Sequence, residues 1–329
     1  MAARDRSLDY TKGLAILLVY LSHSIIYHPI KLNIMYDWCM TLETCIISFN
    51  MPVFFFISGY LFSRSSKGVF ETLKGKFFRL FIPYVFTMLV VCASKLCLPA
   101  SMSFNSAVKG GVGSLIENWL LYGGDRWFIY VLLLIFLVIA PIKEILGNIW
   151  VCIAIMAASM ALYLFGIMPD IFRLDSFAHF LPFFIGGFCL KNFYPKLKEL
   201  INKWWFIVVI LFAVLNVAFV NQIKEIIVVY RIVLPVTGSL IVVLVACALE
   251  KTQQNNCISR YINYLGKYSL QFYLFTFAYP IIRVLVVSKL HVTNPFAIVG
   301  SVLVLQLICT TLIVEVTRRI KLFRIPCGY

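Results

Sequence analysis

Long apolar stretches recur along this chain, and they limit its fold more than any other feature. About ten such runs alternate with clusters of charged residues, Pro or Gly, and each could cross about 30 Å of hydrocarbon as a helix. Only 13% of the residues are charged, whereas a soluble domain averages about 25%. We therefore expect an all-α, polytopic membrane protein. The predicted spans are residues 10–29, 39–62, 79–98, 127–146, 149–168, 177–194, 204–221, 226–249, 268–288 and 295–317.

The net charge of +15 has two possible sources, a nucleic-acid partner or the basic loops of a membrane protein. Most of the 29 basic residues fall in the loops that would be cytoplasmic if the N-terminus is cytoplasmic. This placement predicts a multi-pass protein of the inner (plasma) membrane with both termini in the cytoplasm and no nucleic-acid partner. We expect one membrane domain over residues 1–329, with no fused soluble domain. The ten cysteines lie mostly in apolar runs without metal-ligand spacing, so no metal site is expected.

The first apolar run, RSLDYTKGLAILLVYLSHS, carries Lys12 and His23. Eleven residues of helix separate the two by about three turns and about 16 Å along the axis, so both side chains lie on one face. Ionisable groups inside spans are usually functional. The alternative is that Lys12 only extends its amine to the membrane interface and that a neighbouring helix provides a hydrogen-bond partner for His23.

Glu43 in the second predicted span matches His23 in depth. An adjacent antiparallel helix could therefore place its carboxylate against the imidazole, which would orient the ring as a general base requires. The alternative is that Glu43 faces an aqueous vestibule. His179, near the outer end of its own span, is interpreted as structural.

Basic and aromatic residues mark both ends of the predicted bundle. Lys76 and Arg79 stand at the cytoplasmic end of the third span, where they could hold donor phosphates or simply anchor the helix. At the outer end of the fourth span Trp127 is an interfacial residue, and Asp125 and Arg126 are candidates for a surface ion pair. The preceding stretch SLIENWLLYGG is predicted to form a short interfacial helix.

Several segments, taken in order, resemble the acyltransferase 3 family of membrane O-acyltransferases. They are the Lys12 to His23 spacing, NMPVFFFISGYLF in the second span, Lys76-Phe-Phe-Arg79 leading into RLFIPY, Trp127-Phe128, and the late LGKYSLQFYLF. One position departs from the family, because Thr276 follows where many members have histidine.

The resemblance implies a bundle of ten helices that moves an acyl group, usually acetyl, from cytoplasmic acetyl-CoA to a hydroxyl of a cell-surface or lipid-linked glycan. It implies that His23 is catalytic, as a base or an acyl carrier, and that Lys76 and Arg79, with Lys12, contact acyl-CoA. Glu43 is chosen on geometric grounds as the partner of His23. We assign substrate binding to Trp127, Arg126 and Asp125.

Two other functions stay open from the sequence. His23 and Glu43 could form the proton relay of a transporter or flippase, although no inverted repeat is visible. A scaffold without activity would leave the Lys12 to His23 stripe unexplained. The expected partners are acyl-CoA, a glycan acceptor and membrane lipids, with homo-oligomers possible.

Overall fold

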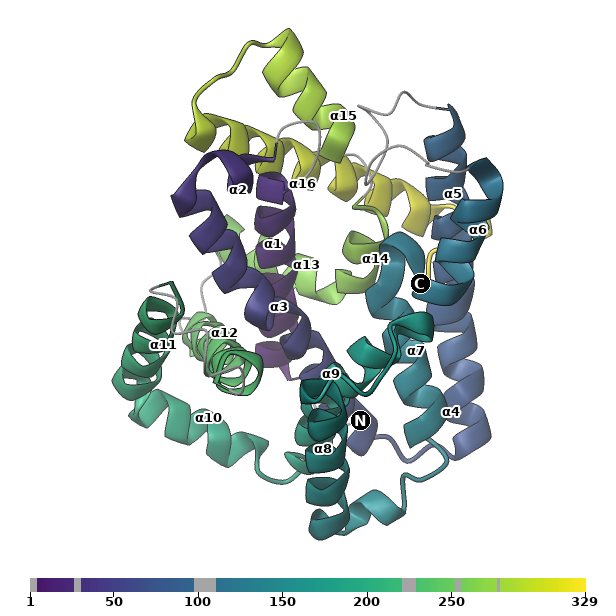
Figure 1. The fold of residues 1–329 in the computed structure, drawn as a ribbon, viewed down its shortest axis with the longest axis vertical. Coiled ribbons are helices and arrows are strands. Elements are labelled where there is room, and N and C mark those ends of the chain that lie inside the picture. The colour runs from purple at the N-terminus through teal and green to yellow at the C-terminus, as the bar shows by residue number, and fades with distance from the viewer. Residues whose placement is uncertain (1–4, 27–30, 98–110, 221–228, 252–255, 277–278) are drawn as a thin grey trace.

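The structure, a computed structural model, describes residues 5–26, 31–97, 111–220, 229–251, 256–276 and 279–329, and these residues form helices joined by turns (Figure 1). In the first half of the chain the helices are α1 (Arg6–Ile26), α2 (Leu32–Met35), α3 (Asp37–Ser63), α4 (Val69–Lys76), α5 (Ile82–Cys97), α6 (Gly111–Tyr122), α7 (Trp127–Ile139) and α8 (Ile149–Leu164). In the second half they are α9 (Leu174–Cys189), α10 (Tyr194–Lys203), α11 (Trp205–Val220), α12 (Leu234–Lys251), α13 (Cys257–Lys267), α14 (Ser269–Leu274), α15 (Tyr279–Val284) and α16 (Pro295–Arg319). The all-α prediction is confirmed, and α6 confirms a helix at SLIENWLLYGG.

Short π-helical and 3₁₀-helical turns connect or extend several helices. The π-helical turns are η1 (Phe77–Phe81), η5 (Val229–Val233) and η6 (Leu285–Lys289), and the 3₁₀ turns are η2 (Gly124–Arg126), η3 (Ile145–Gly147), η4 (Ile171–Arg173) and η7 (Lys321–Phe323).

Several helices are long and apolar enough to cross a membrane, so the chain is a multi-pass membrane protein. Five stretches qualify by length and hydropathy among the described residues, and the bent pair α10 and α11, with an angle of 81° between them, raises the number to six. The total of ten spans stays a prediction. The segment predicted as one span over 268–288 is divided into α14, α15 and η6.

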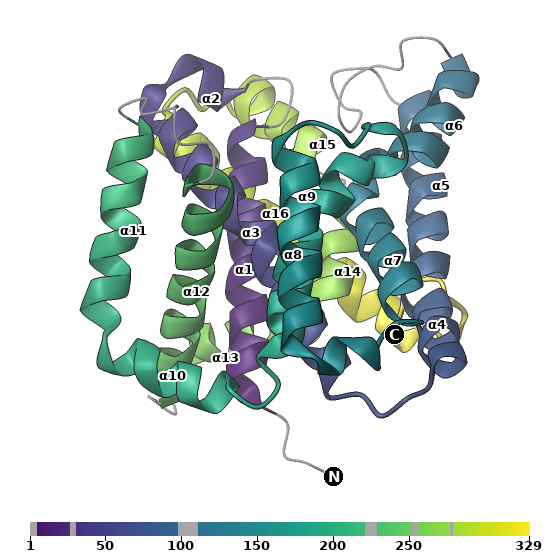
Figure 2. The same cartoon turned by 60° about the horizontal axis from the view of Figure 1, so that its bottom comes forward.

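Helix α1 runs through the middle of the bundle and organises the packing around it. It packs against α3, α12, α13 and α16, and α3 packs in turn along α9. Figure 2 shows α11 and α12 on one side of α1 and α4, α5 and α7 on the other. This arrangement places the α1 face that carries Lys12 and His23 inside the protein.

Glycines allow the closest helix crossings. A Cβ atom on Gly59 of α3 would collide with the carbonyl of Phe184 on α9, and one on Gly187 of α9 would collide with the carbonyl of Phe56 on α3. Small residues let helix backbones approach closely in membranes, where lipid tails compete with apolar side chains. Gly59 and Gly187 therefore let α3 and α9 cross with their backbones in contact.

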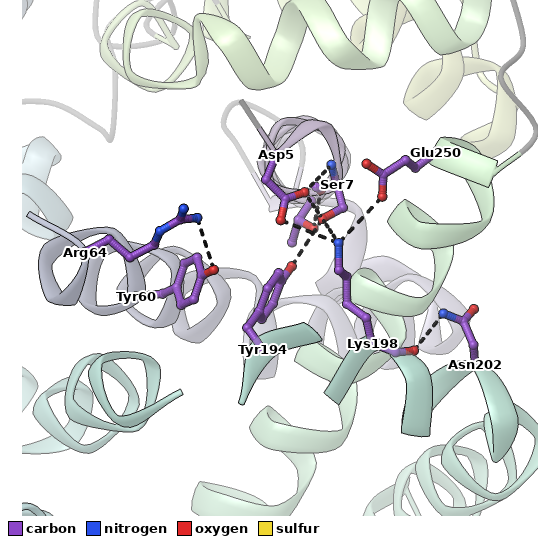
Figure 3. A network of polar contacts seen from close by, with 9 residues as sticks. Asp5, Ser7, Tyr60, Arg64, Tyr194, Lys198, Asn202 and Glu250 are labelled. Atoms are coloured by element: carbon purple, nitrogen blue, oxygen red, sulfur yellow. Dashed lines mark hydrogen bonds and ion pairs between the residues drawn. The ribbon is translucent and has the colours of Figure 1, made fainter. Parts of the chain in front are cut away.

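A polar network holds the N-terminal end of α1 to neighbouring helices (Figure 3). Lys198 of α10 lies 3.5 Å from a carboxylate oxygen of Asp5 and 3.8 Å from one of Glu250 on α12. Its Nζ also donates to the hydroxyl of Ser7 over 3.3 Å. These contacts fix the end of α1 at which Lys12 lies.

Candidate active site

His23 lies in the last turn of α1, where two cavities meet. The first, which we call the polar cavity, has a volume of about 450 Å³. The second, the arginine cavity, has a volume of about 280 Å³. Met51 and Trp127 line both cavities as His23 does. A group bound in either cavity therefore has access to the imidazole.

Residues far along the chain fix the turn that carries His23. The ring of Tyr279 meets the imidazole edge-to-face, with the ring centres 5.5 Å apart, and its hydroxyl donates to the carbonyl of Tyr20 over 2.9 Å. The fully buried guanidinium of Arg283 donates to the carbonyl of Ile25 over 3.3 Å. A cation at a helix C-terminus stabilises the exposed carbonyls and the helix dipole. Together these contacts hold the end of α1 in place.

The structure places Glu43 on the wall of the polar cavity that His23 also lines. Its carboxylate is buried, and Asn50 lies two turns further along α3 on the same wall. The predicted histidine and carboxylate are thus brought to one cavity from adjacent helices.

Helices α8 and α9 contribute further polar residues to the polar cavity, which the sequence did not predict to be functional. His179 of α9 stacks on Tyr163 of α8, with ring centres 4.3 Å apart and an angle of 6° between the planes. Asp175 and Arg231 line the same cavity. Within the described residues, the buried His179 Nε2 and Asp175 Oδ1 atoms have no hydrogen-bond partner, so both are available to a bound molecule. The spacing of Asp175 and His179, four residues apart on one helix face, is the signal that could have identified them.

Arg126 lines the arginine cavity together with two other cations, Lys95 and Arg173, and the idea of a surface ion pair at this position is wrong. Its side chain is 1% exposed, and its Nη2 atom donates to the carbonyl of Leu274 over 2.8 Å. Asp125 forms an ion pair of 2.7 Å with Lys95 of α5, and both of these side chains are largely buried. Gly123 and Gly124 have positive φ, and the turn they form brings Asp125 and Arg126 inward from the C-terminal end of α6.

The predicted donor residues line a third cavity of about 160 Å³, which we call the basic cavity. Lys12, Lys76 and Arg79 line it, and Lys267 adds a fourth cation that was not predicted from the sequence. Lys76 lies 3.9 Å from the ring centre of Phe136. Tyr273 lines both the basic and the arginine cavity. The basic cavity therefore adjoins the arginine cavity on which His23 opens.

The arrangement combines an imidazole, a buried guanidinium, buried carboxylates and a cluster of cations at one end. Of the described residues, no group of three or more His, Cys, Asp and Glu is placed to hold a metal ion. The groups present suit proton transfer and the binding of negatively charged and hydroxyl-bearing molecules.

A family model described as an acyltransferase domain covers residues 5–315, nearly the whole chain. No curated protein and no solved structure matches the chain.

Proposed function

The chain belongs to the acyltransferase 3 family and is a membrane acyltransferase, and from that premise we propose that it moves an acetyl group from cytoplasmic acetyl-CoA to a hydroxyl of a cell-surface or lipid-linked glycan. His23 is the reacting residue in this proposal. The observation that carries it is the position of His23, which opens on one cavity suited to hydroxyl groups and on another that adjoins four cations.

The donor enters by the basic cavity. Lys12, Lys76 and Arg79 contact the phosphates of coenzyme A, because paired cations form short, charge-assisted hydrogen bonds with phosphate oxygens. Lys12 and His23 are about 16 Å apart along α1, and the pantetheine arm covers this distance past Tyr273. The orientation predicted from the basic loops puts this cavity on the cytoplasmic side.

The transfer itself needs a base and a partner for negative charge. The oxygen of the acceptor hydroxyl forms a bond to the thioester carbon, and His23 takes the proton of that hydroxyl at the same time. The carbon–sulfur bond then breaks, and the proton passes from the imidazole to the departing sulfur, which leaves an ester and free coenzyme A. Arg126, buried in the cavity that His23 lines, stabilises the negative charge on the thioester oxygen. A route through an acyl group on His23 would use the same nitrogen as nucleophile.

The acceptor occupies the polar cavity. Glu43 orients the imidazole, and Asp175 and His179 hydrogen-bond the hydroxyl groups of the glycan. Trp127 lines both cavities and offers a flat apolar surface to a sugar ring, beside Asp125 and Arg126.

The test compares His23→Asn with His291→Asn in liposomes supplied with labelled acetyl-CoA and a glycan acceptor. Asparagine keeps a polar side chain but has no titratable nitrogen, so we expect His23→Asn to lower the rate of transfer by about 10²- to 10⁴-fold. His291 is exposed and lies outside the three cavities, so its variant should keep the wild-type rate. Full activity in a correctly inserted His23→Asn protein would disprove the catalytic role.

A further inference from the structure

A fourth cavity, which we call the apolar cavity, has a volume of about 500 Å³ and lies among α3, α8, α9 and α12. Among the residues that the structure describes, Thr11 and Ser239 are the only ones with polar side chains that line it. Each hydroxyl donates to a carbonyl of its own chain segment, that of Thr11 to Ser7 over 2.8 Å and that of Ser239 to Pro235 over 2.7 Å. The walls therefore offer a ligand almost nothing but apolar surface.

The apolar cavity directly continues the polar cavity along the same helices. On α9, His179 lines the polar cavity and Pro182 the apolar one, and on α8 Tyr163 and Met160 do the same. On α3 the change falls between Met51 and Val53. Each pair is within about one helical turn, or about 5 Å. The two cavities are thus stacked end to end, with the polar one beside His23.

The apolar cavity has empty space beside Gly186. A Cβ atom added to Gly186 would meet no atom within 4 Å, whereas one on the adjacent Gly187 would collide with α3. Packing therefore accounts for Gly187, while the absence of a side chain at Gly186 leaves room for a bound molecule.

We infer that the apolar cavity binds the hydrocarbon chain of a lipid-linked acceptor whose hydroxyl-bearing head group occupies the polar cavity. This inference rests on the proposed function and names its acceptor class as membrane-anchored rather than free glycan. The stacking of the cavities favours this occupant, since one amphiphile would place its polar head beside His23 and its chain in the apolar cavity. Holding the chain in place also raises the effective concentration of the hydroxyl at the imidazole.

The test uses a polyprenyl phosphate with a photoreactive group in its chain, bound to the purified full-length protein in nanodiscs. Mass spectrometry should find the label on α8, α9 and α12 residues of the apolar cavity. Gly186→Trp fills the open space and should lower this labelling about tenfold or more, because it removes the room in which the apolar chain is buried. The matched control is Gly300→Trp, since Gly300 is exposed on α16 and also has no atom within 4 Å of an added Cβ. Coenzyme A binding should be the same in both variants.

A second variant allows the test to be made even if Gly186→Trp misfolds. If Gly186→Trp fails to insert, Ser239→Phe fills the same cavity from α12. Two results would overturn the inference. One is labelling that is spread over the lipid-facing surface. The other is labelling that phosphatidylglycerol competes away as well as unlabelled polyprenyl phosphate does. In either case acyl transfer by the wild-type protein would still support the proposed function. If the wild type transfers no acyl group to any acceptor, the proposed function fails and the inference with it.

Discussion

At the residue scale, the position of His23 depends on groups that lie far from it in the sequence. Tyr279 and Arg283 hold the last turn of α1 from α15, and Arg126 comes from the turn before α7. A histidine inside a span suggests function because burying an ionisable group in lipid is costly. The sequence therefore pointed to His23 as a candidate, and its catalytic role stays a prediction. Asp125 and Arg126 were interpreted as a surface pair because such pairs are common at interfaces.

Lys76 provides a test of donor binding at the same scale. Replacing it with Met removes a cation from the basic cavity, and we expect the KM for acetyl-CoA to rise about tenfold or more, because a charge-assisted hydrogen bond contributes about 1.5–3 kcal/mol. Steady-state kinetics with the purified protein would measure this. Lys74, two residues earlier and exposed on α4, is the matched control and should leave KM unchanged when replaced by Met.

A second substrate makes this test specific for the phosphates. With acetyl-dephospho-CoA, which lacks one phosphate group, the difference between Lys76→Met and the wild type should shrink if Lys76 contacts that phosphate, and it should persist if Lys76 contacts the others. Equal KM values for all proteins with acetyl-CoA would contradict a role for Lys76 in donor binding.

At the element scale, the crossing of α3 and α9 sets the shape of both the polar and the apolar cavity. Gly59 and Gly187 each face a carbonyl of the other helix, so the two backbones are in contact at the crossing. The apolar runs predicted the helices, since period and length are local properties. They did not predict the break of the ninth span into α14 and α15, because residues 268–288 read as one apolar run.

The two adjacent glycines of α9 give a prediction about this crossing. Gly187→Ala should destabilise the protein by about 1–3 kcal/mol, because the added methyl group collides with backbone that cannot move without separating the helices. Thermal unfolding of the detergent-solubilised protein would show a lower Tm. Gly186→Ala adds the same atom in open space and should match or slightly exceed the wild-type Tm, since alanine favours the helix. An equal loss in both variants would contradict the role of the crossing, since a Cβ atom at Gly186 makes no contact with α3.

At the scale of the whole molecule, the direction of the chain across the membrane decides which substrate reaches which cavity. The proposed function needs the basic cavity on the cytoplasmic side and His23 nearer to the outer side. Helix α13 packs on the N-terminal half of α1, where Gly266 faces the backbone of Asp9, and it therefore marks the end of the bundle predicted to be cytoplasmic.

Cysteine labelling tests this orientation. Cys97 and Cys257 are exposed, and the other eight cysteines are buried or half-buried. With a cytoplasmic N-terminus, Cys97 lies at the outer end of α5 and Cys257 at the inner end of α13. A membrane-impermeant maleimide should then label Cys97 in intact cells and Cys257 only after permeabilisation, with Cys97→Ser and Cys257→Ser identifying each signal. The reverse pattern would place the basic cavity outside the cell and contradict entry of a cytoplasmic donor.

The sequence by itself determined the helical membrane fold and the spacing of Lys12 and His23. Both follow from local geometry, since the rise and rotation of a helix fix how its own residues relate. It also placed Lys76 and Arg79 near the same end as Lys12. These three cations line one cavity in the structure.

The tertiary structure decided which distant residues surround His23 and where empty space remains. Lys267, His179 and Arg231 join the cavities only because particular helices cross at particular points. The apolar cavity was not visible in the sequence, because residues that face lipid and residues that line an apolar cavity have the same composition. The physical difference lies in the packing between helices, which no single apolar run encodes.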